Sequence, residues 1–144
     1  MEIELDFLKR SELAEYKELI DTVLGESQPI EIYLNNYKEN HTHLKVVVAK
    51  KDSKIIGTIT IALIDGFTGF YDPRIEFFNF AVSKEARGTD ASVQLMKFVE
   101  NAALNFGYKT IGVNCFKDAQ RAHAFYEKSG FERADTVRYV KILK

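Results

Sequence analysis

Residues 86–95 read ARGTDASVQL, and this stretch decides the fold expected for the chain. An Arg-Gly pair follows a strand-like apolar run, and small residues then lead into an apolar helix. Amide groups at a helix N-terminus, together with the positive end of the helix dipole, bind anions such as a pyrophosphate. The stretch therefore predicts a phosphate-binding turn, although Asp90 places a carboxylate where the anion would sit.

The segments that flank this turn predict alternating strands and helices. The apolar run before it, IEFFNFAV at 75–82, predicts a strand buried on both faces. After it, apolar residues at helical spacing predict a helix that ends at Gly107. The remaining elements are a strand over 108–116, a helix over 118–130 and one or two final strands within 131–144.

The N-terminal half has its own pattern of a strand, two helices and a hairpin. The first strand alternates apolar and acidic residues and is expected at or near a sheet edge. Ser11 is expected to cap the first helix and Gly25 to end it. In order, these elements are a strand over 1–8, helices over 11–25 and 30–40, hairpin strands over 43–50 and 54–65, and a surface loop over 65–74.

Together these elements predict an α/β fold. A mixed, mostly antiparallel sheet would contain a central parallel pair and would be flanked by about four helices. The 144 residues fit a single domain over 1–144. Sheets of this kind generally place ligands outside the carboxyl ends of their central strands.

The composition excludes several classes of function. With 20 basic and 21 acidic side chains, no affinity for nucleic acid is indicated, and no apolar run is long enough to span a membrane. The one cysteine, Cys115, is expected to be a buried, inert thiol without a histidine partner, which favours a cytoplasmic protein. His41, His43 and His123 have no metal-ligand spacing, so no metal site is expected.

Two motifs carry a resemblance to a known family. AVSKEARGTDAS at 81–92 resembles the pyrophosphate loop of the GNAT superfamily of N-acetyltransferases, and AHAFYEKSGF at 122–131 is similar to a late helix of the same superfamily. The resemblance covers nearly the whole chain in element order. It implies acetyl-CoA as cosubstrate and an amine, either a small molecule or a peptide, as acceptor.

The resemblance also implies a set of cofactor-binding residues. The backbone of Ala81 and Val82 would pair with the pantetheine amides, and the turn would bind the pyrophosphate. Ala119 replaces an asparagine that is frequent in the family, so one polar contact to the cofactor arm is expected to be missing. The positions assigned to the cofactor are Ala81, Val82, Arg87, Gly88, Thr89, Asp90, Ala91, Ser92, Ala119 and Phe125.

Asp90 leaves two interpretations open. The family pattern would place glycines at positions 90 and 92, where a bare backbone lets phosphates approach closely. Either Asp90 caps the helix and fills the anion site with its own charge, or its carboxylate turns outward and the backbone still cradles the phosphates.

Two residues are candidates for acid–base catalysis by this resemblance. Glu76 matches a glutamate that takes a proton from the amine, and Tyr126 matches a tyrosine proposed as general acid for the leaving thiolate. Ordinary alternatives are a solvent-facing Glu76 and a Tyr126 that only packs.

The predicted enzyme is an acetyl-CoA-dependent N-acyltransferase, and the alternative is a GNAT-fold binding or regulatory module. Terminal strands leave room for a homodimer.

Overall fold

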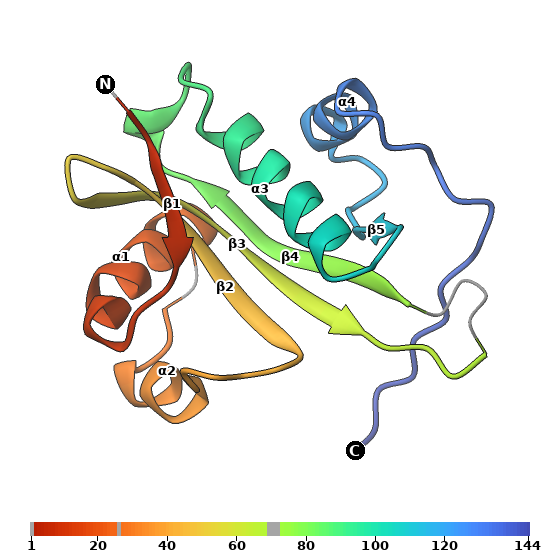
Figure 1. The fold of residues 1–144 in the computed structure, drawn as a ribbon, viewed down its shortest axis with the longest axis horizontal. Helices are drawn as coiled ribbons and strands as arrows, with labels where there is room; N and C mark the ends of the chain where they lie inside the picture. The colour runs from red at the N-terminus through yellow and green to blue at the C-terminus, as the bar shows by residue number, and fades with distance from the viewer. Residues whose placement is uncertain (1, 26, 69–72) are drawn as a thin grey trace. The chain divides into compact units, whose positions relative to one another are not determined.

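The protein is built on a five-stranded sheet with the order β1-β2-β3-β4-β5 (Figure 1). The computed structural model describes residues 2–25, 27–68 and 73–144, which form two compact units, 1–113 and 114–144. Neighbouring strands are antiparallel except β4 and β5, which are parallel, as the sequence predicts. The strands are β1 (Glu4–Phe7), β2 (Leu44–Lys51), β3 (Lys54–Ile64), β4 (Arg74–Val82) and β5 (Ile111–Gly112).

The described residues also form four α-helices and two 3-10 turns. Gly25 ends the first helix, as predicted, but Ser11 does not cap it. Ser11 lies inside a 3-10 turn, where the side chain of Glu12 accepts a hydrogen bond of 2.8 Å from the amide of Lys9. The helices are α1 (Leu13–Leu24), α2 (Ile30–Asn36), α3 (Ala91–Asn105) and α4 (Gln120–Lys128), and the 3-10 turns are η1 (Arg10–Glu12) and η2 (Lys84–Ala86).

Within residues 1–113, helices cover both faces of the sheet. Val48 of β2 belongs to the apolar cluster formed with α1. Because successive side chains of a strand point to opposite faces, Val47 points away from this cluster. Helix α3 packs on that second face, where a Cβ added at Gly57 would lie 3.1 Å from Leu95. Gly57 therefore lets α3 approach the centre of the sheet closely.

One irregularity interrupts the pairing of β3 with β4. Thr58 pairs with Ala81 but Thr60 pairs with Phe78, so Ile59 stands opposite two residues of β4, Asn79 and Phe80. Asn79 has a positive φ of 52°. This combination is a β-bulge, which bends a strand and re-aims its side chains. Phe78, next to the bulge, is 44% exposed, whereas the sequence predicted a strand buried on both faces.

The C-terminal part departs most from the sequence prediction. All of residues 131–144 are described, and none of them lies in a strand, so the predicted final strands are wrong for this structure. Strand β5 is likewise far shorter than the predicted 108–116. Strand propensity alone does not form a strand without a hydrogen-bonding partner, and the side chains of Val137 and Tyr139 remain exposed.

Candidate active site

The turn at the start of α3 presents backbone amides to solvent. Gly88 has a φ of 86°, a conformation that glycine adopts without steric cost. The hydroxyl of Thr89 donates to the carbonyl of Ala86 and accepts from the amide of Ala91 at 3.3 Å. Among the described residues, the amides of Ser92 and Val93 have no hydrogen-bond acceptor. Such unpaired amides at a helix N-terminus are the groups that bind an anion.

The carboxylate of Asp90 is directed along the helix. Asp90 occupies the N-cap position, but its side chain makes no cap hydrogen bond, so the capping interpretation is wrong. Its Oδ2 atom instead accepts a hydrogen bond of 2.9 Å from the side-chain amide of Gln94, in an exposed position. The geometry agrees with the alternative in which the carboxylate turns outward.

Arg87 lines a hollow beside this turn. The hollow has a volume of about 350 Å³ and lies between α1 and the η2 turn. Its walls carry both signs of charge, with Lys54 and Lys84 next to Arg87 and with Glu15 and Glu18 contributed by α1. Glu85 also lines the hollow, so its three basic side chains are matched by three acidic ones.

The end of β4 has a free edge. The amide of Ser83 donates to the carbonyl of Ile56 at 2.8 Å, on the β3 side. Since hydrogen-bonding groups alternate along a strand, the amide and carbonyl of Val82 face the other edge. Within the described pairing, β5 reaches β4 only at Ile75 and Glu76, so no strand occupies that edge at Val82. An extended ligand can pair with the backbone there.

Glu76 lies on the α1 face of the sheet in a space that a glycine provides. Oε1 of Glu76 accepts a hydrogen bond of 3.0 Å from Nε of Arg74. A Cβ added at Gly112 of the neighbouring strand would lie 2.8 Å from Oε2 of Glu76. The Glu76 side chain is 31% exposed, so solvent reaches the carboxylate. The arrangement positions a charged, accessible proton acceptor at the parallel pair of strands.

Sequence reasoning missed both neighbours of Glu76. Gly112 stands inside a strand, where glycine frequently marks a close approach of another group. Arg74 precedes Glu76 by two residues, and this spacing places both side chains on one face of a strand. Each signal is present in the sequence but is weak without the pairing of β4 with β5.

Tyr126, Phe125 and Ala119 belong to the second unit. Burial, followed by the charge of Cys115, raises the pKa of Tyr126 above its ordinary value. The Tyr126 ring packs against those of Phe125 and Phe131, with centroids 5.7 and 5.6 Å away. Ala119 occupies the N-cap of α4 without a side-chain hydrogen bond. Tyr126 thus keeps its proton in a half-buried aromatic setting.

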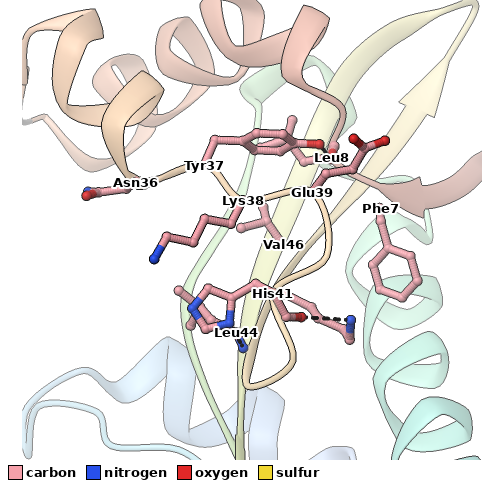
Figure 2. A pocket seen from close by; sticks show the side chains of 10 residues that line it. Phe7, Leu8, Asn36, Tyr37, Lys38, Glu39, His41, Leu44 and Val46 are labelled. Carbon is pink, nitrogen blue, oxygen red and sulfur yellow. Dashed lines mark hydrogen bonds between the residues drawn. The ribbon is translucent and has the colours of Figure 1, made fainter.

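The described aromatic residues Tyr33, Tyr37 and Phe67 differ in their surroundings. Tyr33 and Tyr37 pack against the α1 cluster, and the Tyr37 hydroxyl donates to the carbonyl of Leu8 at 3.1 Å. Phe67 is fully exposed, whereas Phe70, Tyr71 and Glu26 lie outside the described residues. A small pocket of about 120 Å³ lies beside Tyr37, with Glu39 and His41 in its wall (Figure 2).

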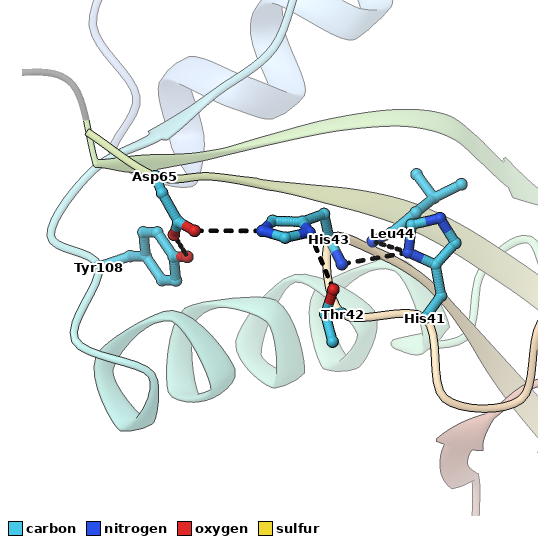
Figure 3. Close-up of polar contacts among 6 residues, drawn as sticks. All are labelled: His41, Thr42, His43, Leu44, Asp65 and Tyr108. Atoms are coloured by element: carbon cyan, nitrogen blue, oxygen red, sulfur yellow. Dashed lines mark hydrogen bonds and ion pairs between the residues drawn. The ribbon is translucent and has the colours of Figure 1, made fainter. Parts of the chain in front are cut away.

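Two of the histidines take part in hydrogen bonds that hold loops (Figure 3). Nε2 of His43 lies 3.1 Å from Oδ2 of Asp65, and the Tyr108 hydroxyl donates to Oδ1 of Asp65 at 2.6 Å. These hydrogen bonds, that of Tyr108 above all, lower the pKa of Asp65, and the bond from Tyr108 to Asp65 raises the pKa of Tyr108. Nδ1 of His41 accepts hydrogen bonds from the backbone amides of His43 and Leu44.

Cys115 corrects a prediction from the sequence. It is exposed instead of buried, and its sulfur lies 3.6 Å from Nδ1 of His123. The expectation of a buried thiol without a histidine partner is therefore wrong. In the described part of the chain no three potential metal ligands cluster, and no helix there is long and apolar enough to cross a membrane.

Comparison with known families gives one match. The model of the acetyltransferase (GNAT) family matches residues 10–131, which is most of the chain. A comparison with curated proteins gave no match.

Solved structures share the fold at low sequence identity. The aminoglycoside acetyltransferase AAC(6')-Iy, in complex with the bisubstrate analog CoA-S-monomethyl-acetylneamine, has a TM-score of 0.85 and 17% identity, with 100% of both chains covered. AAC(6')-Ih from Acinetobacter baumannii has a TM-score of 0.82 and 18% identity, with 99% of each chain covered. Ribosomal-protein-alanine N-acetyltransferase from Brucella melitensis biovar Abortus 2308 has a TM-score of 0.80 and 16% identity, covering 99% of this chain and 100% of that one.

Proposed function

Since this chain belongs to the acetyltransferase (GNAT) family, we propose that it is an N-acetyltransferase that moves an acetyl group from acetyl-CoA to an amine. The amine nitrogen attacks the thioester carbonyl directly, the carbon–sulfur bond breaks, and CoA leaves as the thiol. Three tasks fall to the protein: it binds the pyrophosphate, accepts the proton of the amine and stabilises the leaving thiolate.

The observation that carries the proposal is the setting of Glu76. Its carboxylate is charged, accessible and held between Arg74 and the space above Gly112. In the proposed reaction it takes the proton of the attacking amine, directly or through a water molecule. Oε1 is engaged by Arg74, so Oε2 is the oxygen that we assign to proton transfer.

The turn at the start of α3 is the proposed pyrophosphate site. The unpaired amides of Ser92 and Val93 and the positive charge of Arg87 support this assignment. Val82 would bind pantetheine through the free backbone edge of β4, whereas the backbone of Ala81 faces its partner Thr58 on β3. Acetyl-CoA is also the natural cosubstrate to test because AAC(6')-Iy has been solved with CoA.

Tyr126 is the proposed acid. Its pKa is raised by burial, so its hydroxyl stays protonated at neutral pH and can donate to the thiolate of CoA. The proton that Tyr126 gives up is replaced from solvent after the product leaves. Phe125 and Ala119 would line the cofactor arm in the same unit.

The acceptor is proposed only as a class, namely a primary amine. Aminoglycoside acetyltransferases and a ribosomal-protein-alanine acetyltransferase are about equally similar to this chain, at 17%, 18% and 16% identity. An acceptor panel should therefore contain aminoglycosides and peptides with a free N-terminal amine.

The experiment that tests the proposal measures release of free CoA with this panel for the wild type and two variants. Glu76→Gln and Tyr126→Phe should each lower kcat by about 100-fold or more, because general acid–base groups typically contribute that much. Glu132→Gln and Tyr139→Phe remove the same chemical groups at exposed positions and should leave kcat unchanged.

A second candidate is a GNAT-fold domain that has lost efficient CoA binding and serves as a binding or regulatory module. Ala119, which offers no polar side chain at the start of α4, favours this alternative. A thermal melt separates the two candidates, because acetyl-CoA at 100 times its Kd stabilises a binding protein by about 2.7 kcal/mol. No shift in Tm, together with no release of CoA from any acceptor, would rule out the acetyltransferase.

A further inference from the structure

Cys115 and His123 form a pair that has no part in the proposed acetyl transfer. Cys115 lies in the connection that precedes α4, and His123 lies on the helix itself. The sulfur is 3.6 Å from Nδ1 and 3.9 Å from Nε2 of the imidazole, and the thiol is exposed. Both residues belong to the second unit, so their contact is local.

Backbone carbonyls fix the protonation of the imidazole. Nε2 of His123 lies 2.8 Å from the carbonyl oxygen of Phe116 and 3.0 Å from that of Lys117. Carbonyl oxygens only accept hydrogen bonds, so Nε2 carries a proton in both the neutral and the charged imidazole. Nδ1, the nitrogen nearer the sulfur, is therefore the atom that gains or loses a proton.

This arrangement matches what a nucleophilic thiol requires. The thiolate is the reactive form of cysteine, and a base held in orientation by a third group activates a nucleophile. Here the two carbonyls orient the base. In sequence, the charged or titratable residues that flank the pair are Lys117 and Asp118 on the connection and Arg121, Tyr126 and Glu127 on α4, and of these Tyr126 interacts electrostatically with Cys115.

We propose that Cys115 is a reactive thiol, with His123 as its proton acceptor, and that it forms a mixed disulfide with disulfides of low-molecular-weight thiols. The proton of Cys115 moves to Nδ1 of His123, and the sulfur attacks one sulfur of the disulfide. A new bond forms between the two sulfurs as the original disulfide bond breaks. Cys115 is oxidised, and the departing thiolate is reduced and takes up a proton.

Oxidised glutathione is the probe for the test, and the mass of the intact protein is the readout. Because the chain has one cysteine, a single adduct reports on Cys115 alone. At pH 6.5 a free thiol with a pKa of about 8.5 is almost entirely protonated. The wild type should therefore react at least about tenfold faster than His123→Gln at this pH, and the two rates should converge above pH 9.

Two control variants accompany the test. Cys115→Ser should form no adduct, and His41→Gln, which removes an imidazole elsewhere, should react like the wild type. Gln at position 123 can still donate a hydrogen bond to the two carbonyls. If it nevertheless does not fold, the wild type is compared at pH 6.5 with the same protein unfolded in urea. Equal rates of adduct formation in either comparison would overturn the proposal.

Discussion

The direction of the Asp90 carboxylate leads to a prediction about CoA affinity. Because the carboxylate accepts from Gln94 in an exposed position, it interacts weakly with an anion at the helix start. Two unit charges 4 Å apart in water interact by about 1 kcal/mol, which corresponds to roughly a fivefold change in Kd. Asp90→Asn, which keeps the hydrogen-bond acceptor, should therefore tighten CoA binding by less than about fivefold in calorimetric titrations. Glu100→Gln on the same helix is the control. A tenfold tightening in Asp90→Asn alone would mean that the carboxylate faces the phosphates.

The side-chain contacts of single residues were the hardest feature to predict from the sequence. That Asp90 precedes a helix follows from the sequence, but its partner does not, because the helix amides and Gln94 compete for the same carboxylate. The contact between Cys115 and His123 was missed for a similar reason. It depends on the path of the connection before α4, which has no periodic pattern.

At the scale of elements, the pairing of β4 with β5 leads to a prediction about Gly112. A methyl group at this position would lie 2.8 Å from Oε2 and 2.9 Å from Oε1 of Glu76, so the carboxylate must move. Gly112→Ala should lower kcat of the proposed acetyl transfer by about tenfold or more, since displacement by 1 Å can cost up to 100-fold. In a Glu76→Gln background the same change should have little further effect. Additive losses in that double variant would show that Gly112 acts by another route.

The sequence predicted correctly the strands that pair along most of their length, such as β2 and β3. It also predicted strands in segments that have no pairing partner, and these predictions were wrong. The alternation of apolar residues in β2 and β3 marks a hairpin, and the hairpin formed as predicted. Residues 131–144 carry similar β-branched residues but make no strand, because propensity becomes structure only through pairing. The family motifs predicted the turn before α3, whereas the space at Gly112 became visible only with the strand register.

At the scale of the whole molecule, Tyr16 predicts how stability depends on alkaline pH. Tyr16 is only 5% exposed in the apolar cluster between α1 and the sheet, and burial raises its pKa above the ordinary value of 10.0. Folding thus favours the neutral phenol of Tyr16. The stability that this preference adds is fully present below about pH 10 and is lost as pH rises through the raised pKa. Between pH 9 and 11, the Tm of the wild type should fall further than that of Tyr16→Phe. The Tm of Tyr139→Phe, which removes an exposed hydroxyl, should fall by as much as that of the wild type.

The fold class was predictable because its signals repeat along the chain. Apolar periodicity, glycine stops and two family motifs all point to a mixed α/β sheet, and the sheet order and the GNAT family match confirm it. The single domain over 1–144 stays a prediction, since residues 1–113 and 114–144 form separate compact units. The roles of Glu76 and Tyr126 rest on the kinetic test proposed above.

The bulge at Asn79 changes the parity of β4. In a regular strand, residues an even number of positions apart share a face, and residues an odd number apart do not. Glu76 pairs with Ala62 and Ala81 pairs with Thr58, two residues of β3 that point the same way. Glu76 and Ala81 therefore share a face although five positions separate them. The extra residue at the bulge therefore places the side chain of Ala81 on the same face as the proposed proton acceptor and turns the side chain of Val82 to the other face.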